Sequence, residues 1–380
     1  MQRFTSSIGS AFGALALLGL TALAAQAQTT SGTTAPTPGN SPTAANYTPK
    51  FPHGIWELSH ENDWFIYSDR DYTGGLRLAY TTPNYRDWSQ VPLVPGAYGQ
   101  FFNNISLIND DWATVAAAAY AQINIYTPDD QKINPPNPND YPYSGWVGMG
   151  TDLIRQTSDR RAIFEVNLGL IGPESGAAQL QDSFHSSIGD SQPAGWDHQL
   201  KDEPVLQLTY RQDWRIPGLT NLNPSVRQTW GYDVIGHGLA TVGNGWDYAA
   251  TGAQVRYGYH LPLDFGPSRM RLGDVSTMPY VPGGTMPSTA GWSLDSLSAY
   301  VTFGAEGRAI ARDITLDGNT WARSASVSKE PLVAEIYGGL TVEYGNFRGS
   351  FLVLYETNTF RAQPSNQGQW RGILTLGYSF

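Results

Sequence analysis

The chain has 380 residues, of which 23 are Lys or Arg and 33 are Asp or Glu, so its formal net charge is −10 at pH 7. Because protein surfaces that bind nucleic acid are basic, this charge argues against a nucleic-acid partner. The chain contains no cysteine, which excludes disulfide bonds and a thiol nucleophile.

The N-terminal residues have the features of a secretory signal peptide. Arg3 provides a short positive region, residues 11–23 form an apolar run, and an Ala-Gln-Ala triplet at 25–27 supplies the small residues that a signal peptidase needs. We therefore expect residues 1–27 to be removed and the protein to be exported.

A stretch of biased composition follows the signal peptide. Residues 28–50 consist mainly of Thr, Ser, Pro, Gly, Ala and Asn, with almost no apolar bulk to compensate the entropy lost on ordering. We expect a flexible leader there and a single folded domain over residues 51–380.

The overall composition is typical of a transmembrane β-barrel. The chain has 21 Tyr, 12 Trp and 41 Gly with only 15% charged residues, and its mean hydropathy is −0.32. Barrels show this profile because lipid-facing and lumen-facing residues alternate, while Tyr and Trp gather at the membrane interfaces. No stretch after the signal peptide approaches the ~20 continuous apolar residues that a transmembrane helix requires, so any membrane span must be made of strands. A soluble β-sandwich could show the same alternation.

Twelve segments alternate apolar and polar residues with a period of two, which predicts β-strands. In the clearest of them, Phe164 and Val166 share one face, and Glu165 and Asn167 share the other. An even number of strands is what a closed, single-chain antiparallel barrel requires. We therefore predict an all-β fold: a closed antiparallel transmembrane barrel of about 12 strands, with short helical pieces in its outer loops. The predicted strands cover residues 54–63, 73–82, 115–126, 143–154, 161–171, 203–214, 226–240, 249–260, 298–312, 332–344, 347–358 and 370–380.

The last predicted strand has a feature of its own. Residues 370–380 alternate up to the aromatic C-terminal residue Phe380. This resembles the terminal strand by which bacterial outer-membrane barrels are recognised for assembly, which makes the barrel assembly machinery an expected partner. An ordinary closing strand is the alternative interpretation.

Strand parity predicts which polar residues meet. With both termini on the periplasmic side, the connections from odd to even strands point outward. The longest of these, residues 172–202, lies within a patterned stretch that reaches residue 204 and contains His185 in a polar setting. The polar clusters at 61–63 and 69–73 reach the same rim. Together they predict a functional site there, although each cluster alone is more typical of a solvated loop.

Two of the predicted inner connections do not fit short periplasmic turns. They cover residues 83–114 and 261–297. Either they hold small elements below the barrel, or the strand count misses a pair.

Several short motifs follow one another along the chain. They are Glu61-Asn62-Asp63, Asp71-Tyr72-Thr73-Gly74-Gly75, Tyr126-Thr127-Pro128-Asp129-Asp130, Pro142-Tyr143-Ser144-Gly145-Trp146, Gly172-Pro173-Glu174, Gln181, His185, Gly189, Gly195-Trp196-Asp197-x-Gln199-Leu200-x-x-Glu203-Pro204 and Thr315-Leu316-x-Gly318. In this order they resemble the lipid A 3'-O-deacylases (LpxR-like proteins) of Gram-negative outer membranes. The resemblance is strongest over residues 55–204 and looser beyond them.

The resemblance implies a twelve-stranded barrel whose extracellular rim holds a calcium-dependent acyl hydrolase. It makes His185 the general base that takes a proton from water, with Asn62, Asp63 and Thr73 beside it. These residue types suit ester hydrolysis, since a neutral His can accept a proton and an Asn amide or a cation can stabilise an oxyanion. Ca²⁺ takes several oxygen ligands, for which Asp63, Asn62 and nearby carbonyls are the candidates.

The chain departs from the family pattern at positions that bear on substrate recognition. Tyr141 stands where the family usually has Arg, and Gly74 where it often has Asn. Lys132 is the candidate for the basic residue that meets a phosphate in some members, and Asp71 is a second candidate substrate contact. These departures concern recognition of the phosphorylated sugar rather than the chemistry.

We therefore predict an outer-membrane hydrolase that removes an ester-linked acyl chain from lipid A of lipopolysaccharide, with its active site facing the extracellular leaflet. An outer-membrane phospholipase with a serine nucleophile is an alternative, although no base is arranged for Ser186 or Ser187 and the chain has no G-x-S-x-G motif. His198 is close enough to His185 in sequence to be a second candidate base. A non-catalytic narrow porin or structural barrel is the other alternative, although about twelve strands leave little lumen once side chains fill it.

Overall fold

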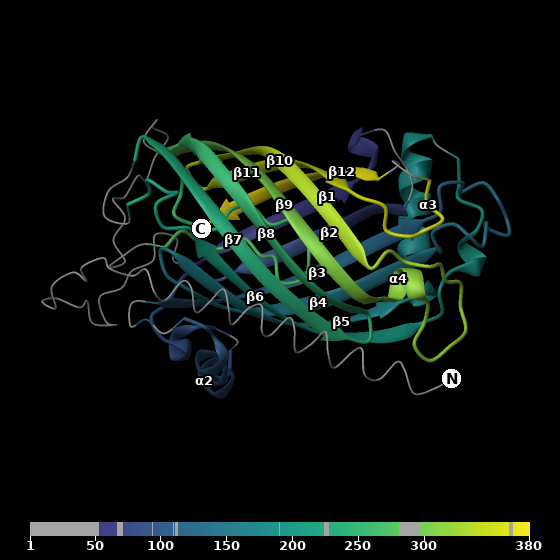
Figure 1. Cartoon of the computed structure of the whole chain (residues 1–380), viewed down its shortest axis with the longest axis horizontal. Coiled ribbons are helices and arrows are strands. Elements are labelled where there is room, and N and C mark those ends of the chain that lie inside the picture. The colour runs from purple at the N-terminus through teal and green to yellow at the C-terminus, as the bar shows by residue number, and fades with distance from the viewer. Residues whose placement is uncertain are drawn as a thin grey trace, which may run out of the picture.

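In the computed structural model, antiparallel strands form the wall of a barrel (Figure 1). The predicted signal peptide and leader, and Asp69 of the predicted rim cluster, lie outside the residues that the structure describes. The described residues are 53–66, 71–92, 94–108, 110, 113–189, 191–223, 228–280, 296–364 and 368–380.

Twelve strands in the described residues form the wall, each antiparallel to its neighbours. The first strand pairs with the last, from Ile55 opposite Ser379 to Asn62 opposite Gly372, and this pairing closes the barrel. The predicted closed, twelve-stranded antiparallel barrel is therefore confirmed. The strands are β1 (Ile55–Asn62), β2 (Asp71–Thr81), β3 (Thr114–Thr127), β4 (Ser144–Gln156), β5 (Arg160–Ile171), β6 (Glu203–Arg215), β7 (Trp230–Gly243), β8 (Trp246–Tyr259), β9 (Leu297–Asp313), β10 (Leu332–Tyr344), β11 (Phe347–Glu356) and β12 (Gln369–Ser379).

The two ends of the barrel differ. At one of them, the amide of His53 donates to the carbonyl of Phe380 over 2.9 Å, so we call it the terminal end. The opposite end, the loop end, holds every odd-to-even connection, as strand parity predicts. It carries most of the short helices, in agreement with the predicted helical pieces of the outer loops (Figure 1). Helices at the loop end are η2 (Trp64–Ile66), η4 (Pro173–Ser175), α3 (Ala177–Ile188), η5 (Trp196–His198) and α4 (Ile314–Asp317), and those near the terminal end are η3 (Trp88–Gln90) and α2 (Gly96–Ile105).

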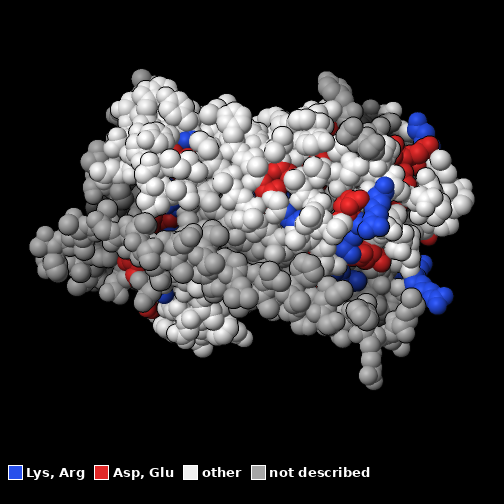
Figure 2. All heavy atoms as spheres, viewed as in Figure 1, with Lys and Arg blue, Asp and Glu red and all other residues white. Residues whose placement is uncertain are grey.

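Side chains alternate between the lumen and the outer surface along the strands. On β5, Glu165 and Asn167 are fully buried, whereas Val166 and Leu168 are exposed. Figure 2 shows one face of the wall, where few charged side chains appear over the middle and more of them gather toward the loop end. An apolar outer face suits a wall that contacts lipid, and among the described residues no helix is long and apolar enough to span a membrane.

One hairpin is longer than predicted. The sequence predicts a loop over 241–248, but β7 and β8 continue to a turn of two residues, Asn244 and Gly245. The side chain of Gln207 on β6 holds this turn, because its Oε1 accepts hydrogen bonds from the amides of Gly245 and Trp246. This long-range contact has no periodic signal in the sequence.

The long connection after β8 enters the barrel instead of lying below it. Residues 261–280, the lumen segment, rise from the terminal end, and Val275 packs on the lumen-facing Ala116, Ala118, Ile154 and Ile163. The prediction of extra elements below the barrel is therefore wrong for this connection. No missed strand pair lies within its described residues.

Buried ion pairs tie the lumen segment to the wall. The guanidinium of Arg269 lies 2.7 Å from Glu306 and 3.1 Å from Glu335, and that of Arg271 lies 2.9 Å from Glu335 and 3.3 Å from Glu61. Charges buried in this way are stable only when they are paired. The positive charges of the lumen segment are therefore balanced by carboxylates of strands β1, β9 and β10.

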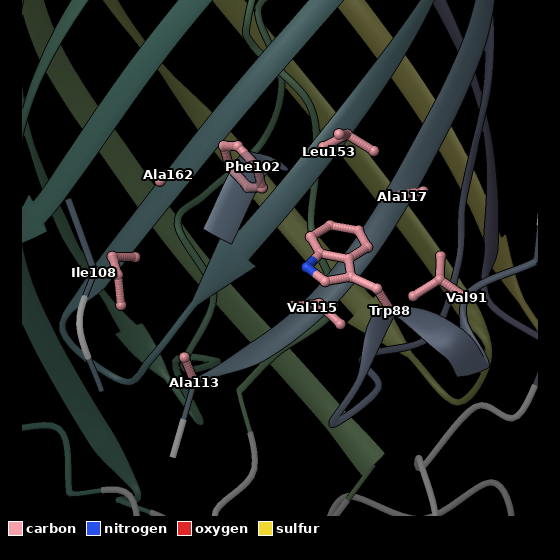
Figure 3. Packing of buried hydrophobic residues seen from close by; sticks show 9 residues of the cluster. All are labelled: Trp88, Val91, Phe102, Ile108, Ala113, Val115, Ala117, Leu153 and Ala162. Carbon is pink, nitrogen blue, oxygen red and sulfur yellow. The ribbon is translucent and has the colours of Figure 1, made fainter. Parts of the chain in front are cut away.

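The connection after β2 lies on the outside of the wall. Trp88 of η3 and Phe102 of α2 pack on Val115, Leu153 and Ala162 (Figure 3). The neighbours of these three residues in the strands belong to the cluster around Val275 of the lumen segment, so the packing lies on the opposite side of the wall. This connection does hold small extra elements, η3 and α2, but they lie beside the barrel instead of below it.

Candidate active site

A cavity lies at the loop end, on the outer face of the wall, between strands β1 to β3 and helix α3. Its volume is about 140 Å³. It combines polar groups with apolar side chains, which is the usual make-up of a site for an amphipathic ligand. The cavity is lined by His60, Asn62, Trp64, Thr73, Gly74, Gly75, Leu76, Ile125, Leu180, Gln181, Phe184 and His185.

Strand geometry brings the polar residues of the wall together. Asn62 pairs with Gly74 across β1 and β2, and both face outward. The pairing of β2 with β3 shifts register between Tyr72 and Gly74, which leaves Thr73 as the extra residue of a bulge. The hydroxyl of Thr73 lies 2.6 Å from that of Thr127 on β3, which fixes its position at the cavity wall.

Helix α3 forms the opposite side of the cavity. Gln181 anchors it, since its side-chain nitrogen donates to Gln131 over 3.0 Å and its side-chain oxygen accepts from the indole of Trp196 over 2.9 Å. Trp196 packs in turn on Tyr143, with ring centroids 5.0 Å apart. The Gly-Trp-Asp cluster at the end of the predicted functional loop therefore positions the helix that carries the histidine.

His185 points from α3 into the cavity and is only 4% exposed. Its Nδ1 lies 2.8 Å from the carbonyl oxygen of Ser191. A carbonyl can only accept a hydrogen bond, so Nδ1 carries the proton in the neutral ring and Nε2 carries the lone pair. The fold therefore selects the tautomer in which Nε2 can act as a base.

Asn62 is also held in one orientation. Its Oδ1 accepts a hydrogen bond from the amide of Trp64 over 2.6 Å. Nδ2 is therefore the atom of this side chain that can donate hydrogen bonds. Nδ2 lies over Gly74, where the Cβ of any other residue would stand 2.9 Å from it.

The structure separates the predicted site residues into two groups. His185, Asn62 and Thr73 line the same cavity, whereas Asp71 and Lys132 do not. Asp71 is buried, and its carboxylate accepts a hydrogen bond from Gln363 over 2.8 Å. Lys132 is exposed in the connection between β3 and β4, next to Gln131, which contacts α3.

The predicted calcium ligands lie at the end of β1. Asn62 lines the cavity and Asp63, the next residue, is 1% exposed and is not in the lining. In the part of the chain that the structure describes, no group of three or more Asp, Glu or His side chains could hold a metal ion. The donor types fit Ca²⁺, which accepts one carboxylate together with amide and backbone carbonyl oxygens and water.

Tyr141, which departs from the family pattern, lies away from this cavity. Its ring stacks on Tyr126 with centroids 5.8 Å apart, and its hydroxyl lies 2.7 Å from that of Thr315. Burial raises the pKa of the Tyr141 phenol well above its usual value, so the phenol stays protonated and neutral. An Arg at this position would place a charge in this aromatic cluster.

His60 also lines the cavity, although it belongs to none of the motifs found in the sequence. It lies two positions before Asn62 on β1, so both side chains face outward. Its ring packs against Phe65 with centroids 5.6 Å apart. The period-two alternation of β1 was the signal that could have identified it.

Comparisons with known proteins bear on the whole chain. The family model described as outer membrane protein LpxR matches residues 14–380. Among solved structures, LpxR from Salmonella typhimurium is 19% identical, covers 86% of this chain and 100% of its own, and has a TM-score of 0.64. This structural similarity shows that the two chains share the same barrel fold.

More distant barrels are also similar. The beta domain of the Bordetella autotransporter Brka is 8% identical, covers 86% of this chain and 99% of its own, and has a TM-score of 0.38. The translocator domain of the autotransporter NalP from Neisseria meningitidis is 12% identical, covers 89% and 91%, and has a TM-score of 0.36. These values are too low to bear on function, and no curated protein matches the sequence. Since the family model spans most of the chain, this protein belongs to the outer membrane protein LpxR family, which confirms the resemblance found in the sequence.

Proposed function

We propose that this protein is an outer-membrane hydrolase that removes an ester-linked acyl chain from lipid A. The family and its motifs support this activity, and the cavity supplies the groups that it needs. In this proposal the loop end faces the outside of the cell, so the cavity lies at the level of the leaflet that holds lipopolysaccharide.

The observation that carries the proposal is the hydrogen bond from His185 to the Ser191 carbonyl. It leaves Nε2 of His185 as the basic atom inside the cavity. A water oxygen attacks the acyl carbonyl carbon while Nε2 takes one of the water protons. When the tetrahedral intermediate collapses, the bond between the carbonyl carbon and the sugar oxygen breaks, and the imidazolium returns the proton to that oxygen.

We assign to Asn62 the stabilisation of the negative charge that develops on the carbonyl oxygen. The amide of Trp64 holds its Oδ1, so Nδ2 is the end that presents donors, and the absence of a Cβ at Gly74 keeps the approach to Nδ2 open. Removing one such donor typically slows a reaction of this type by ~100- to 1,000-fold. Thr73 then shapes the cavity beside it through its bond to Thr127.

Calcium is part of the proposal, with Asp63 and Asn62 as its protein ligands. When bound, the ion would supply positive charge to polarise the ester carbonyl. The ligand atoms would be the oxygens of the buried Asp63 carboxylate and Oδ1 of Asn62, whose second lone pair is not used by the Trp64 amide.

The apolar lining suits an acyl chain. Leu76, Ile125 and Leu180 border the cavity, and Leu76 and Leu78 continue along the exposed outer face of β2. An acyl chain can therefore reach the cavity along the wall without leaving the lipid. Lys132 remains the predicted contact of a phosphate and Asp71 a predicted substrate contact. Lys132→Ala should raise KM with little change in kcat, and an unchanged KM would remove Lys132 from substrate binding.

A serine phospholipase finds less support in the structure. Among the described residues, no serine lines the cavity. Ser187 donates a hydrogen bond to the carbonyl of Phe184, and Ser186 accepts one from Gln192, so the partner in each of these bonds is an amide group and not a base. Serine-directed acylating reagents should leave activity unchanged, and inactivation by such a reagent would favour the phospholipase.

A porin finds less support as well. The lumen segment is tied into the barrel by the buried ion pairs of Arg269 and Arg271, so the lumen is filled. A cavity of about 130 Å³ lies in the lumen at the loop end, where Arg271 of the lumen segment and Arg371 of β12 border it.

Mass spectra of lipid A from cells with and without the protein test the proposal. Loss of one ester-linked acyl unit only in cells that make the protein is the expected result. Identical lipid A in both cell types, with the barrel folded in the outer membrane, would contradict it.

A further inference from the structure

Helix α2 forms an apolar surface that the proposed reaction does not use. The helix lies near the terminal end, on the outside of the barrel wall (Figure 1). It contains no charged residue. Its position and composition raise the question of what covers its outer face.

One side of the connection is packed firmly on the wall. Gly99 allows Trp88 to approach the helix, since a Cβ at residue 99 would stand 2.2 Å from the Trp88 ring. Trp88 and Phe102 fill the space over Val115 and Ala117, small residues of an Ala-rich stretch of β3 (Figure 3). The helix is therefore a fixed part of the barrel surface.

Polar contacts also lock the helix in place. Arg155 faces outward on β4, and its guanidinium donates to the Asn103 side chain over 2.8 Å and to the Asp110 carbonyl over 3.3 Å. An outward Arg is costly on a lipid-facing wall unless it finds such partners. Asn103 and Asp110 of the β2–β3 connection supply these partners, so this part of the wall is stable where α2 covers it.

The outer side of the helix divides into an apolar and a polar strip. Tyr98 and Phe101 are 65% and 52% exposed, and Ile105 extends the same strip, because residues three and four apart share one face of a helix. Gln100 and Asn104 form the polar strip on another face. The apolar strip adjoins the wall, where Phe101 lies 6.4 Å from Phe164 between ring centroids.

Elsewhere at the terminal end, neighbouring strands carry exposed aromatic side chains of the kind that form interfacial girdles in outer-membrane barrels. Trp56 pairs with Tyr378, and Tyr378 pairs with Phe347, all of them exposed. Such girdles mark the boundary between acyl chains and headgroups. Near the start of β3 the outward residues are Val115 and Ala117 instead, and the exposed aromatics there belong to α2.

We propose that α2 lies in the lipid–water boundary of the leaflet at the terminal end and completes the aromatic girdle there. Tyr98, Phe101 and Ile105 insert among phospholipid acyl chains, while Gln100 and Asn104 face water. The partner is lipid because the strip is continuous with the lipid-facing wall, combines apolar and aromatic groups, and lacks any charge that a protein partner would pair with. In the orientation proposed above, this is the periplasmic leaflet.

The absence of cysteine from the chain makes a clean test possible. Single-cysteine variants Phe101→Cys and Gln100→Cys are labelled with a nitroxide and reconstituted in vesicles of phosphatidylethanolamine and phosphatidylglycerol. Phe303→Cys on the exposed face of β9 serves as the lipid-facing reference, and Ile105→Cys replaces Phe101→Cys if that variant does not fold. Electron paramagnetic resonance then measures collisions with oxygen, which concentrates in lipid, and with a nickel chelate, which stays in water.

The expected result is a ratio of oxygen to nickel collisions at residue 101 that is several-fold above the ratio at residue 100 and close to that at residue 303. Equal ratios at residues 100 and 101 would show that the strip faces water and would overturn the proposal. An immobilised label at residue 101 with few collisions of either kind would show a protein partner, for instance a second copy of the chain, and would overturn it as well. Neither outcome depends on catalytic activity, so the test is independent of the proposed hydrolysis.

Discussion

The carboxamide nitrogen of Asn62 lies directly over Gly74, at the point where a side chain on residue 74 would have to begin. A Cβ there would stand 2.9 Å from Nδ2 and 3.1 Å from the Glu61 carbonyl oxygen. The two residues are register partners across β1 and β2, so the strand pairing itself brings them together. The amide that we assign to the oxyanion is thus positioned by the wall of the barrel.

Gly74→Ala should therefore reduce activity without unfolding the barrel. The added methyl group displaces the Asn62 amide, so we expect kcat to fall ~10- to 100-fold, which is somewhat less than the loss of a whole oxyanion donor. Turnover of lipid A by the purified variant measures the effect. Gly349→Ala is the matched control, because residue 349 is also a strand glycine and nothing lies within 4 Å of its Cβ position. Equal activity of the two variants would show that the Asn62 amide does not act in the reaction.

Calcium dependence is the second prediction. If Asp63 and Asn62 hold Ca²⁺, a chelator that removes the ion should lower the rate ~100-fold or more, and added Ca²⁺ should restore it. Asp63→Asn should shift the calcium concentration for half-maximal activity upward, since the variant loses the one carboxylate of the proposed ligand set. Turnover that is unchanged in chelator would remove calcium from the mechanism.

The lumen segment leads to a third prediction. Arg269→Met leaves the Glu306 and Glu335 carboxylates without one of their buried partners, so it should destabilise the barrel by ~3 to 5 kcal/mol. The temperature at which the folded band is lost in heat-modifiability gels measures this change. Lys329→Met is the control, since its ion pair with Asp317 lies at the partly exposed loop end and should contribute less than ~1 kcal/mol.

The lumen segment also leads to a prediction about ion conductance in planar bilayers. The wild-type barrel should show no steady current, and replacing residues 262–279 by a short Gly-Ser linker should open one. A steady current through the wild-type protein would show instead that ions can pass the lumen segment, in agreement with the porin alternative.

The barrel itself was predictable from the sequence, because a lipid-facing wall imposes a strict period of two. Val166 and Leu168 against Glu165 and Asn167 show this pattern, and the structure places them on opposite faces of β5. Strand parity also predicted that His185 and Asn62 would lie at the same end. Parity depends only on the order and number of strands, so it tolerates errors of a few residues in their bounds.

The lumen segment and the packing of η3 and α2 on the outer wall could not be predicted from such a pattern. Arg269 and Glu335 are 66 residues apart, and nothing periodic in either segment indicates that they meet. The hydrogen bond of His185 to the Ser191 carbonyl depends on the turn after α3 and likewise leaves no sequence pattern. His60, by contrast, could have been identified, since the alternation that placed Asn62 outward placed it outward as well.

The most direct test of the account compares lipid A from cells that carry His185→Ala with lipid A from cells that carry His198→Ala. His198 is the second candidate base from the sequence, but its Nε2 lies 3.0 Å from Asn134 in an exposed loop and it does not line the cavity. We predict that His185→Ala abolishes release of the ester-linked acyl chain while the barrel stays folded, and that His198→Ala retains it. Full acyl release by a folded His185→Ala barrel would contradict the assignment of His185 as the catalytic base.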